Sequence, residues 1–539
     1  MRSLFLTVAL APAMILCLGA AAEPMRPSAD MVEAVTRRNL PEFVEMLSLP
    51  NDSIKAADIQ ANAKWLEAAF QKRGFVTRQL DNEGKPLVYA EFSKKIPGAP
   101  TILFYMHYDG MPVLPEQWAQ KSPHQPVLRQ RAKPAVTSPA AGLAFTPSTA
   151  SARGAWEDLD FARASAGPID PEWRIFARSA SDDKGPIMMF LSAFDLMAEN
   201  KATPAINVKV ILDAEEEKGS PRISAPVKAN RDLLKSDALI INDGPVHPSN
   251  LPTIIFGNRG NAVVELTVYG PRAPLHSGHY GNYAPNPAQR LSSLLATMKD
   301  ENGRVTVAGY YDGVKLSERE RAILTAVPDD EAALLKRLGI AQAETVGSNL
   351  QEAVQYPSLN IRGMQAAAIG EKGSNIIPAK AVAELDLRTT PGASAAYLVD
   401  LMEKHIVAQG YQLVKAEPTD EERATYPKLA TVKLDRGSNA AFSEMEAPAG
   451  VWVQDSLAET FGKDGAPAKT VRIRLMGGSV PTDKLVEALD MPFVIMPLVN
   501  ADNNQHSYDE NIRLGHLMDG VKAFTGLLQK PYSANAAGK

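Results

Sequence analysis

The sequence predicts an α/β protein in which a large, doubly wound domain carries a smaller, inserted β-α-β-β-α-β domain. Apolar runs in PTILFYMHYDG, AINVKVILDAEEE and SDALIINDG each end in polar residues, as buried parallel strands do at the carboxyl edge of a sheet. Helical patterns such as GPIMMFLSAFDLMAEN lie between them. This order is typical of a doubly wound sheet. Beyond Gly260 the strand-like runs alternate apolar and polar residues, which favours a sheet with one open face.

The inserted domain is predicted from the order of its elements. The alternating strands are NAVVELTVYG, SLNIRGMQAAA, KAVAELDLRTT and YQLVKAEP, and the helices are NPAQRLSSLLATM and SAAYLVDLMEKHIVAQG. This order is that of a ferredoxin-like α/β sandwich. Two further strand-like runs, VRIRLMGG and FVIMPL, come after it. We therefore expect the large domain to be discontinuous, with parts at 27–257 and 425–535 around a small domain at 258–420.

Two segments fall outside this scheme. Residues 1–22 read as a signal peptide, with a positive start, an apolar stretch from Leu4 to Leu18 and a small-residue cleavage site at Ala20-Ala21-Ala22. An uncleaved N-terminal anchor is the alternative. Residues 130–172 are expected to form an insertion loop, since their first part is rich in Ala, Pro, Ser and Thr. The chain is therefore predicted to be secreted, in the periplasm.

Composition narrows the class of protein. The chain has 539 residues, which favours two domains, and a net charge of -5 with a pI near 6.0. This charge excludes a nucleic-acid-binding surface, and no membrane contact is expected after signal cleavage. The single cysteine, Cys17, lies in the signal segment. A chain cut after Ala22 therefore has no thiol nucleophile and no thiolate ligand.

Six residues of metal-binding type carry the chemistry. They lie in the motifs FYMHYDG, SASDDKGP, DAEEEKGS, IINDGP and NNQHSYDEN and are His107, Asp182, Glu216, Glu217, Asp243 and His506. Two imidazoles and three carboxylates are enough to ligate two divalent ions, and one carboxylate remains for proton transfer. This inventory predicts a dinuclear zinc hydrolase.

Each motif alone has an ordinary explanation. His107 and Asp109 could be a structural hydrogen-bonded pair, SDDKG a solvated turn and the acidic run at 215–217 a solvated face. Their joint occurrence favours the metal site, because four of the motifs follow strands predicted to belong to one sheet.

On these motifs, together with NRGN, HSG and GGSVP, the chain resembles the dinuclear zinc metallopeptidase family of carnosine dipeptidases, glutamate carboxypeptidases, aminoacylases and acetylornithine deacetylases. The resemblance runs from about residue 35 to 530. It implies that Asp182 bridges two zinc ions, that His107 and Asp243 complete one site, and that Glu217 and His506 complete the other. Cobalt and manganese are alternative metals.

The resemblance also implies roles outside the ligand set. Glu216 would be the general base, Asp109 the partner that orients His107, and the Asp182–Asp183 peptide bond would be cis. His276, in LHSGHYGN, would reach into the active site of a partner subunit in a homodimer and stabilise the oxyanion. Three residues would bind substrate: Arg388 its carboxylate, and Gly478 and Ser479 its backbone.

One stretch departs from the family pattern. The tyrosine-glycine-arginine-glycine lead-in to the bridging aspartate is replaced by Ile175-Phe176-Ala177-Arg178-Ser179. The stretch between His107 and Asp182 is also about 40 residues longer than the family pattern leads us to expect. Because this segment should lie near the site, the rim of the pocket is where substrate choice is expected to differ.

The predicted function is cleavage of the amide bond of small peptides, of the dipeptidase or carboxypeptidase type. An N-acyl-amino-acid deacylase with the same site is the alternative, since both substrate classes carry a free carboxylate. A catalytically silent binding protein is a third reading, and the presence of Glu216 together with all five ligands counts against it.

Overall fold

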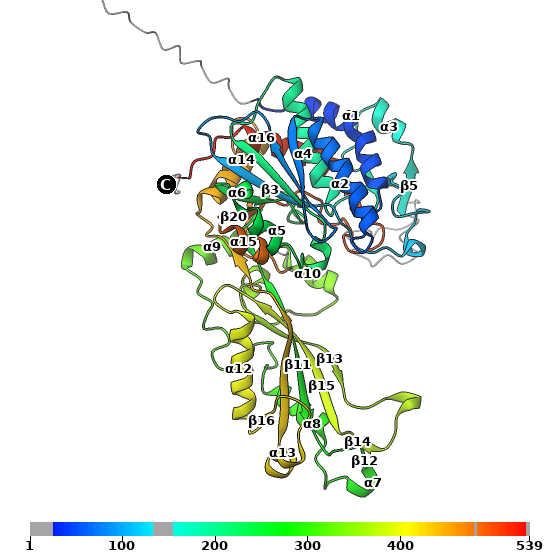
Figure 1. Cartoon of the computed structure of the whole chain (residues 1–539), viewed down its shortest axis with the longest axis vertical. Coiled ribbons are helices and arrows are strands. Elements are labelled where there is room, and N and C mark those ends of the chain that lie inside the picture. The colour runs from blue at the N-terminus through cyan, green and yellow to red at the C-terminus, as the bar shows by residue number, and fades with distance from the viewer. Residues whose placement is uncertain (1–24, 133–154, 479–481, 535–539) are drawn as a thin grey trace, which may run out of the picture.

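The computed structural model describes residues 25–132, 155–478 and 482–534. Figure 1 shows two parts: a broad domain of helices around a sheet, and a narrower domain that projects from it as an arm. The expected signal peptide at 1–22 and the middle of the 130–172 insertion lie outside the described residues. Within the described ranges no helix is long and apolar enough to cross a membrane.

The large domain is built on an eight-stranded sheet. In spatial order its strands are β1 (Phe75–Leu80), β2 (Leu87–Phe92), β7 (Asn207–Asp213), β3 (Thr101–His107), β8 (Ala238–Ile241), β20 (Phe493–Ile495), β9 (Thr253–Ile255) and β19 (Val471–Ile473). The central neighbours β7, β3, β8 and β20 run parallel. Strands from before and after the arm share this sheet, so the chain leaves the large domain and returns to it.

Helices cover both faces of this sheet, as a doubly wound fold requires. One face packs against α1 (Ala29–Ser48), α2 (Ala56–Gln71), α4 (Lys184–Glu199), α14 (Pro448–Phe461) and α16 (Leu514–Gln529). The other face packs against α5 (Ser224–Ala229), α6 (Arg231–Leu234) and α15 (Thr482–Leu489). Alternate residues of β3 explain this: Phe104 belongs to the first core and Leu103 to the second.

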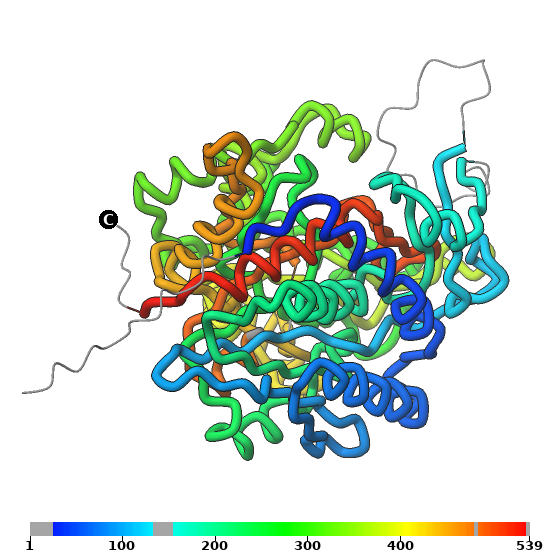
Figure 2. The backbone as a smooth tube through the Cα atoms, turned by 90° about the horizontal axis from the view of Figure 1, so that it is seen from above, coloured from blue at the N-terminus to red at the C-terminus, as the bar shows by residue number. Residues whose placement is uncertain are grey.

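The first and last helices of the domain lie side by side. Figure 2 shows α16 beside α1 and α4, and the contacts among the three helices agree. The helix α4 is buried around most of its circumference because it lies between the sheet and these two helices. This packing holds the segment that precedes α4, which contains Asp182.

A second, four-stranded sheet lies beside the first. Its order is β21 (Asn511–Arg513), β6 (Arg174–Phe176), β4 (Val127–Arg131) and β5 (Trp156–Leu159), and all its pairings are antiparallel. The helix α3 (Phe161–Ala166) follows β5. The described part of the 130–172 insertion contains the end of β4, the strand β5, the short helix α3 and an irregular stretch after it.

The arm confirms the predicted β-α-β-β-α-β class. Its sheet has the order β13 (Ser358–Gln365), β15 (Lys380–Thr389), β11 (Gly260–Tyr269), β17 (Leu429–Gly437) and β16 (Gln412–Leu413). The helices α8 (Pro287–Ala296) and α12 (Ala395–Ala408) cover one face through Leu291 and Leu398.

One strand of the arm was predicted at the wrong place. The expected last strand, YQLVKAEP, contributes only the short β16, whereas β17 is the strand that pairs with β11. The small sheet therefore extends past the expected boundary at 420. The reason is that LATVKLDRG alternates over nine residues, long enough to match β11, while YQLVKAEP ends in a proline after a short run.

A helical excursion of the arm packs against the large domain. It contains α9 (Glu318–Ala326), α10 (Glu331–Leu338) and α11 (Leu350–Ala353), between α8 and β13. Arg474 holds Glu320 at 2.6 Å, and His247 holds Asp329 at 3.0 Å. These two contacts hold the excursion beside the cavity described below.

The remaining elements are short. They are β10 (Gly257–Asn258), β18 (Ala441–Phe442), β12 (Leu275–His276), β14 (Ile376–Ile377), α7 (Ser277–Tyr280), α13 (Asp420–Thr425) and the 3-10 turns Pro115–Gln117, Glu216–Lys218 and Gly370–Lys372. The β12–β14 pair and α7 lie at the far tip of the arm (Figure 1).

Candidate metal centre

Five side chains form two overlapping groups with the geometry of metal sites. His107, Asp182 and Asp243 offer one set of ligand atoms, and Asp182, Glu217 and His506 offer the other. Within each group the ligand atoms lie within 4.8 Å of one another. The two groups share Asp182, which is the arrangement that a carboxylate bridging two ions needs.

The central sheet positions most of these residues. His107 is the last residue of β3, Glu217 follows β7 in a 3-10 turn, and Asp243 follows β8. Because these three strands are parallel neighbours, their carboxyl ends meet at one edge. Asp182 comes instead from the turn between β6 and α4, and His506 from the loop between β20 and β21. The Asp182–Asp183 peptide bond is cis, as predicted.

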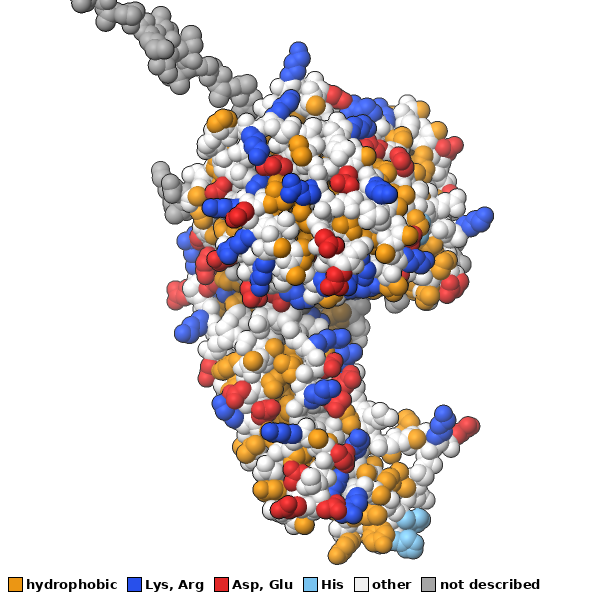
Figure 3. All heavy atoms as spheres, in the orientation of Figure 1, with side chains coloured by type: hydrophobic (Ala, Val, Ile, Leu, Met, Phe, Trp, Pro, Cys, Tyr) orange, Lys and Arg blue, Asp and Glu red, His pale blue; other side chains and the backbone are white. Residues whose placement is uncertain are grey.

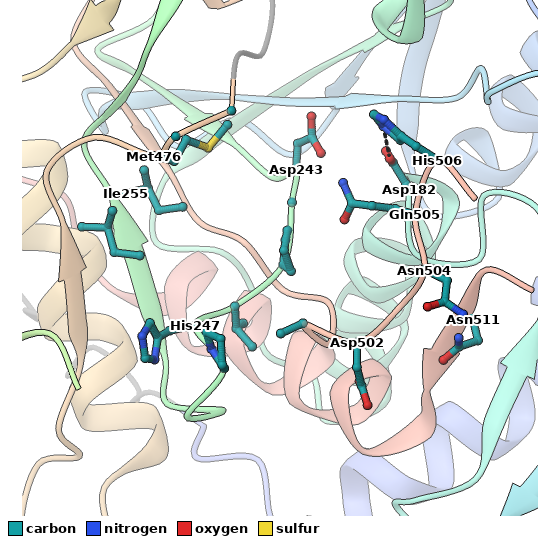
Figure 4. Close-up of a pocket in the computed structure, with 18 of the residues that line it drawn as sticks. Asp182, Asp243, His247, Ile255, Met476, Asp502, Asn504, Gln505, His506 and Asn511 are labelled. Carbon is teal, nitrogen blue, oxygen red and sulfur yellow. Dashed lines mark ion pairs between the residues drawn. The ribbon is translucent and has the colours of Figure 1, made fainter. Parts of the chain in front are cut away.

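Direct contacts tie the imidazoles to the shared carboxylate. His107 Nε2 lies 2.8 Å from Asp182 Oδ1, and His506 Nε2 lies 3.0 Å from Asp182 Oδ2 and 3.1 Å from Glu217 Oε2. Figure 4 shows Asp182 and His506 facing each other, with Asp243 beside them at the same end of the cavity.

Asp109 lies behind this group. Its Oδ1 is 3.4 Å from His107 Nδ1, and its carboxylate accepts hydrogen bonds from the backbone N–H groups of Glu216 and Glu217. One buried carboxylate thus orients an imidazole and the turn that carries the two glutamates, as residues behind metal ligands commonly do.

The pKa values show how strongly negative charge accumulates here. Burial, reinforced by the Asp182 charge, raises the pKa of Glu217 to about 7 and that of Asp243 to about 6. Burial also raises the pKa of Glu216 well above its usual range. Four carboxylates converge with two imidazoles in a buried space, so bound cations would relieve their mutual repulsion. The residues present therefore fit two divalent ions.

A second carboxylate organises the turn that contains Asp182. Glu510 is fully buried and accepts hydrogen bonds from the backbone N–H groups of Ser179, Ser181 and Asp182, at 2.9 to 3.0 Å. Its charge is balanced by Arg178, which donates to Glu510 at 2.8 Å. Sequence reasoning missed Glu510, although its place four residues after His506 in the same motif was a usable signal. It also treated Arg178 only as a departure from the family pattern.

The metal centre opens into a large cavity between the two domains. The cavity has a volume of about 2590 Å³ and is lined by Asp182, Glu216, Glu217, Asp243 and His506, together with parts of α10 and the arm. Figure 3 shows the molecule hollowed on the side where the large domain meets the arm. A peptide and two ions fit in a space of this size.

The predicted substrate-binding residues lie in different places. Gly478 lines the cavity, and Ser479 lies outside the described residues. Arg388 is the next-to-last residue of β15 and lies opposite Asn261, which lines the cavity. His276 is exposed at the tip of the arm, far from the metal ligands of its own chain (Figure 1).

The fold and the two ligand groups define the class of protein: a metal-dependent peptidase or related amidohydrolase. The sequence pattern of peptidase family M20/M25/M40 matches residues 152–530. The chain belongs to this family, and it is a metal-dependent hydrolase.

The relatives of this chain agree with the class. The Cys-Gly metallodipeptidase of Schizosaccharomyces pombe is 24% identical over 533 residues, covering 93% of this chain and 98% of the relative. The cysteinylglycine-S-conjugate dipeptidase of Corynebacterium striatum is 26% identical over 487 residues, covering 87% and 90%. The M20 family metallo-carboxypeptidase of Sulfolobus solfataricus has the same fold, with a TM-score of 0.66 at 24% identity over 91% of this chain and 98% of its own.

Proposed function

We propose that this protein is a dipeptidase that cleaves the amide bond of small peptides with two zinc ions and a glutamate general base. The observation that carries the proposal is the pair of ligand groups sharing Asp182, with Glu216 lining the same cavity. Its relatives support the substrate class, since both sequence relatives named above are dipeptidases.

The roles of the residues follow from their chemistry. Divalent ions held by His107, Asp182 and their three companions would polarise the scissile carbonyl and acidify a water molecule. Glu216, which lines the same cavity as the metal ligands and is not needed as one of them, takes the proton of the attacking water and passes it to the leaving amine. Asp109 keeps His107 in the tautomer that leaves Nε2 free as a ligand.

Substrate binding is proposed for Arg388, at the end of β15, and for the Gly478–Ser479 segment. Arg388 would hold the free carboxylate of the substrate, and the Gly478–Ser479 segment would contact its backbone. An N-acyl-amino-acid deacylase is the second candidate, because such a substrate presents the same carboxylate to Arg388. The choice between the two depends on what the cavity accepts on the other side of the scissile bond.

We also propose that the protein works as a homodimer in which His276 completes the site of the partner. Support comes from the arm, whose β13 and following turn expose Ile361, Met364 and Ile369, the last with 91% of its surface accessible. Exposed apolar side chains on a sheet edge favour association. Mixing His276→Ala with Glu216→Ala protein should restore activity through hybrid sites, up to about a quarter of the wild-type level under random subunit exchange. No rescue after demonstrated subunit exchange would contradict sharing.

Export to the periplasm is proposed from residues 1–22. N-terminal sequencing of the protein from the producing cells should find a mature chain that begins at Glu23. A chain that retains Met1 to Ala22 would favour the N-terminal anchor instead.

The first experiment measures metal content and substrate choice together. We expect about two zinc ions per chain, chelator-sensitive hydrolysis, and restoration by added zinc. A panel of dipeptides and N-acetyl amino acids then separates the candidates, and preference for a dipeptide supports the first. Absence of bound metal and of any metal-restorable hydrolysis would overturn the proposed function.

A further inference from the structure

One wall of the cavity is rich in arginine and lies outside the metal centre. It is formed by the four-stranded sheet β21-β6-β4-β5. We call it the arginine wall and define it by the cavity-lining residues Arg129, Arg131, Trp156, Arg174, Phe176 and Arg513. The proposed function does not use any of these six side chains.

The alternation of the strands explains why this face is polar. Leu128, Ile175 and Ile512 point to the other side of the sheet and belong to the hydrophobic core of the large domain. Their neighbours Arg129, Arg174 and Arg513 point to the cavity. One face of this small sheet thus anchors it, while the opposite face lines the cavity, with Arg129 and Arg174 buried and Arg131 exposed.

The register places like charges side by side. Arg513 is the direct partner of Arg174, and Arg174 is the direct partner of Arg129. Directly opposed like charges on one sheet face are unfavourable. A row of three arginines across three strands therefore calls for anions on the cavity side.

The acidic residues nearby balance only part of this charge. Arg129 contacts Asp158 at 2.7 Å, and Arg174 contacts Asp502 at 2.6 Å. Arg513 shares the same Asp502 at 3.2 Å, and it also approaches the exposed Glu172 at 3.5 Å. Asp502 thus serves two guanidinium groups at once.

Arg131 is the arginine of the wall that has no acidic partner among the described residues. Its guanidinium lies 5.2 Å from the centre of the Trp156 ring, and among the described residues it contacts no carboxylate within 4.0 Å. Arg131 is exposed at the cavity. Stacking on an indole holds a guanidinium in place while its N–H groups stay available to an anion.

The aromatic rings of the wall are already occupied. Arg131 and Arg174 both lie over Trp156, at 5.2 and 5.1 Å, and Arg129 lies over Phe176 at 4.7 Å. Rings covered by cations offer little surface to an aromatic or apolar side chain of a substrate. The wall is therefore built to receive negative charge rather than apolar surface.

The wall is joined directly to the metal centre. Arg174 donates to the backbone carbonyl of Asp502 at 3.2 Å, four residues before His506. Arg174 is the first residue of β6, and the chain after β6 continues through Arg178 into the turn that contains Asp182. The wall and Asp182 line the same cavity, so a peptide bound with its scissile bond at the metal centre can extend a side chain toward the wall.

We propose that the arginine wall is a specificity site for a carboxylate-bearing side chain, so that the protein prefers peptides containing aspartate or glutamate. This inference rests on the proposed peptidase function and names its substrate class. The Arg131 guanidinium would pair with the side-chain carboxylate, and the row behind it would supply the positive potential.

The test compares peptides that differ only in one charge. Hydrolysis of Ala-Glu against Ala-Gln, and of Glu-Ala against Gln-Ala, gives the ratio of kcat/KM for acid over amide at each position. We expect a ratio of about 10 or more at one of the two positions, decreasing as salt is added. Arg131→Gln should lower that ratio at least about fivefold, and Arg131→Lys should retain part of it. Arg78→Gln, an exposed arginine on β1 outside the cavity, should leave the ratio unchanged.

Calorimetric titration of the same peptides into the zinc-loaded Glu216→Gln variant, which is expected to keep its metal ligands but lose most turnover, gives the ratio of affinities separately from the rate. Hydrolysis of neutral dipeptides with acid-to-amide ratios near 1 at both positions would overturn this inference and leave the proposed function intact. Loss of the ratio in Arg78→Gln as well as in Arg131→Gln would also overturn it, because the effect would then be one of net charge. Absence of hydrolysis would overturn the proposed function, and the titration would still decide whether the wall recognises the acid.

Discussion

The metal centre and the arginine wall face the same cavity, yet they are built in opposite ways. The metal centre gathers side chains from segments as far apart in the sequence as His107 and His506. Each ligand lies at the end of a strand or in a separate turn or loop between elements. The wall gathers alternate residues of four short strands. In the first region each residue has a motif of its own, whereas in the second only the pairing of strands reveals the group.

This difference shows which kind of functional site can be recognised from the sequence alone. A ligand must have a particular donor atom, so its neighbours in the chain form a recognisable pattern. A charged wall needs only net charge on one face, which many sequences can provide. The metal centre should therefore respond to single changes with large losses, and the wall with shifts in selectivity.

The largest effect is expected at Glu216. Glu216→Gln removes the proton acceptor but none of the five ligands, so both ions should remain while kcat falls about 10²- to 10⁴-fold. Metal analysis and steady-state kinetics on the same preparation check this. Turnover close to wild type would show that another group takes the proton.

A smaller loss, of metal affinity, is expected at Glu510, which contacts the turn of Asp182 and directly precedes β21 of the wall. Glu510→Gln weakens the acceptor of three backbone N–H groups around Asp182 and leaves Arg178 without its counter-charge. Metal affinity should fall about 10- to 100-fold. Competition with a metal-binding dye measures this. Glu199→Gln on α4, an exposed glutamate paired with Arg38, is the control and should bind metal as the wild type does.

A moderate effect confined to selectivity is expected at Trp156. Trp156→Ala removes the ring under Arg131 and Arg174, so the preference for an acidic peptide should fall about two- to fivefold, less than in Arg131→Gln. Trp156→Phe keeps a ring and should retain most of the preference. Equal preferences in the Ala and Phe variants would mean that the ring does not hold Arg131.

The last prediction concerns stability at low pH rather than activity, and it rests on His516, which lies behind the wall. Burial, helped by the positive charge of Arg513, lowers the pKa of His516 to about 4. The unfolded chain therefore binds a proton near pH 6.5 that the folded chain refuses, and stability falls as the pH drops from about 6.5 to 4. Each unit of the shift is worth about 1.4 kcal/mol, or ~3 kcal/mol across this window.

His516→Gln should flatten this dependence. Denaturant unfolding at pH 7.5 and pH 5 gives the difference in the free energy of unfolding for each protein, so any packing cost of the substitution cancels. An equal loss of stability on acidification in the wild type and in His516→Gln would assign the dependence to other groups.

Much of the fold could be predicted from local patterns. The strands that lead to His107, Glu216 and Asp243 are mostly apolar because both of their faces are covered, and β15 of the arm alternates because one face is open. The error at the last strand of the arm arose where two short runs competed. Only pairing with β11 distinguishes LATVKLDRG from YQLVKAEP, and pairing is not a local property.

The sequence by itself determined the family, the class of fold and the residues that can bind metal, because donor atoms and periodicity are written in the order of the residues. Only the tertiary structure decided that Glu510 organises the turn of Asp182, that His276 lies at the tip of the arm, and that four arginines share one wall. These facts depend on register and on contacts between distant segments. Such contacts form only when distant segments meet in the folded chain, so no single segment of the sequence reveals them.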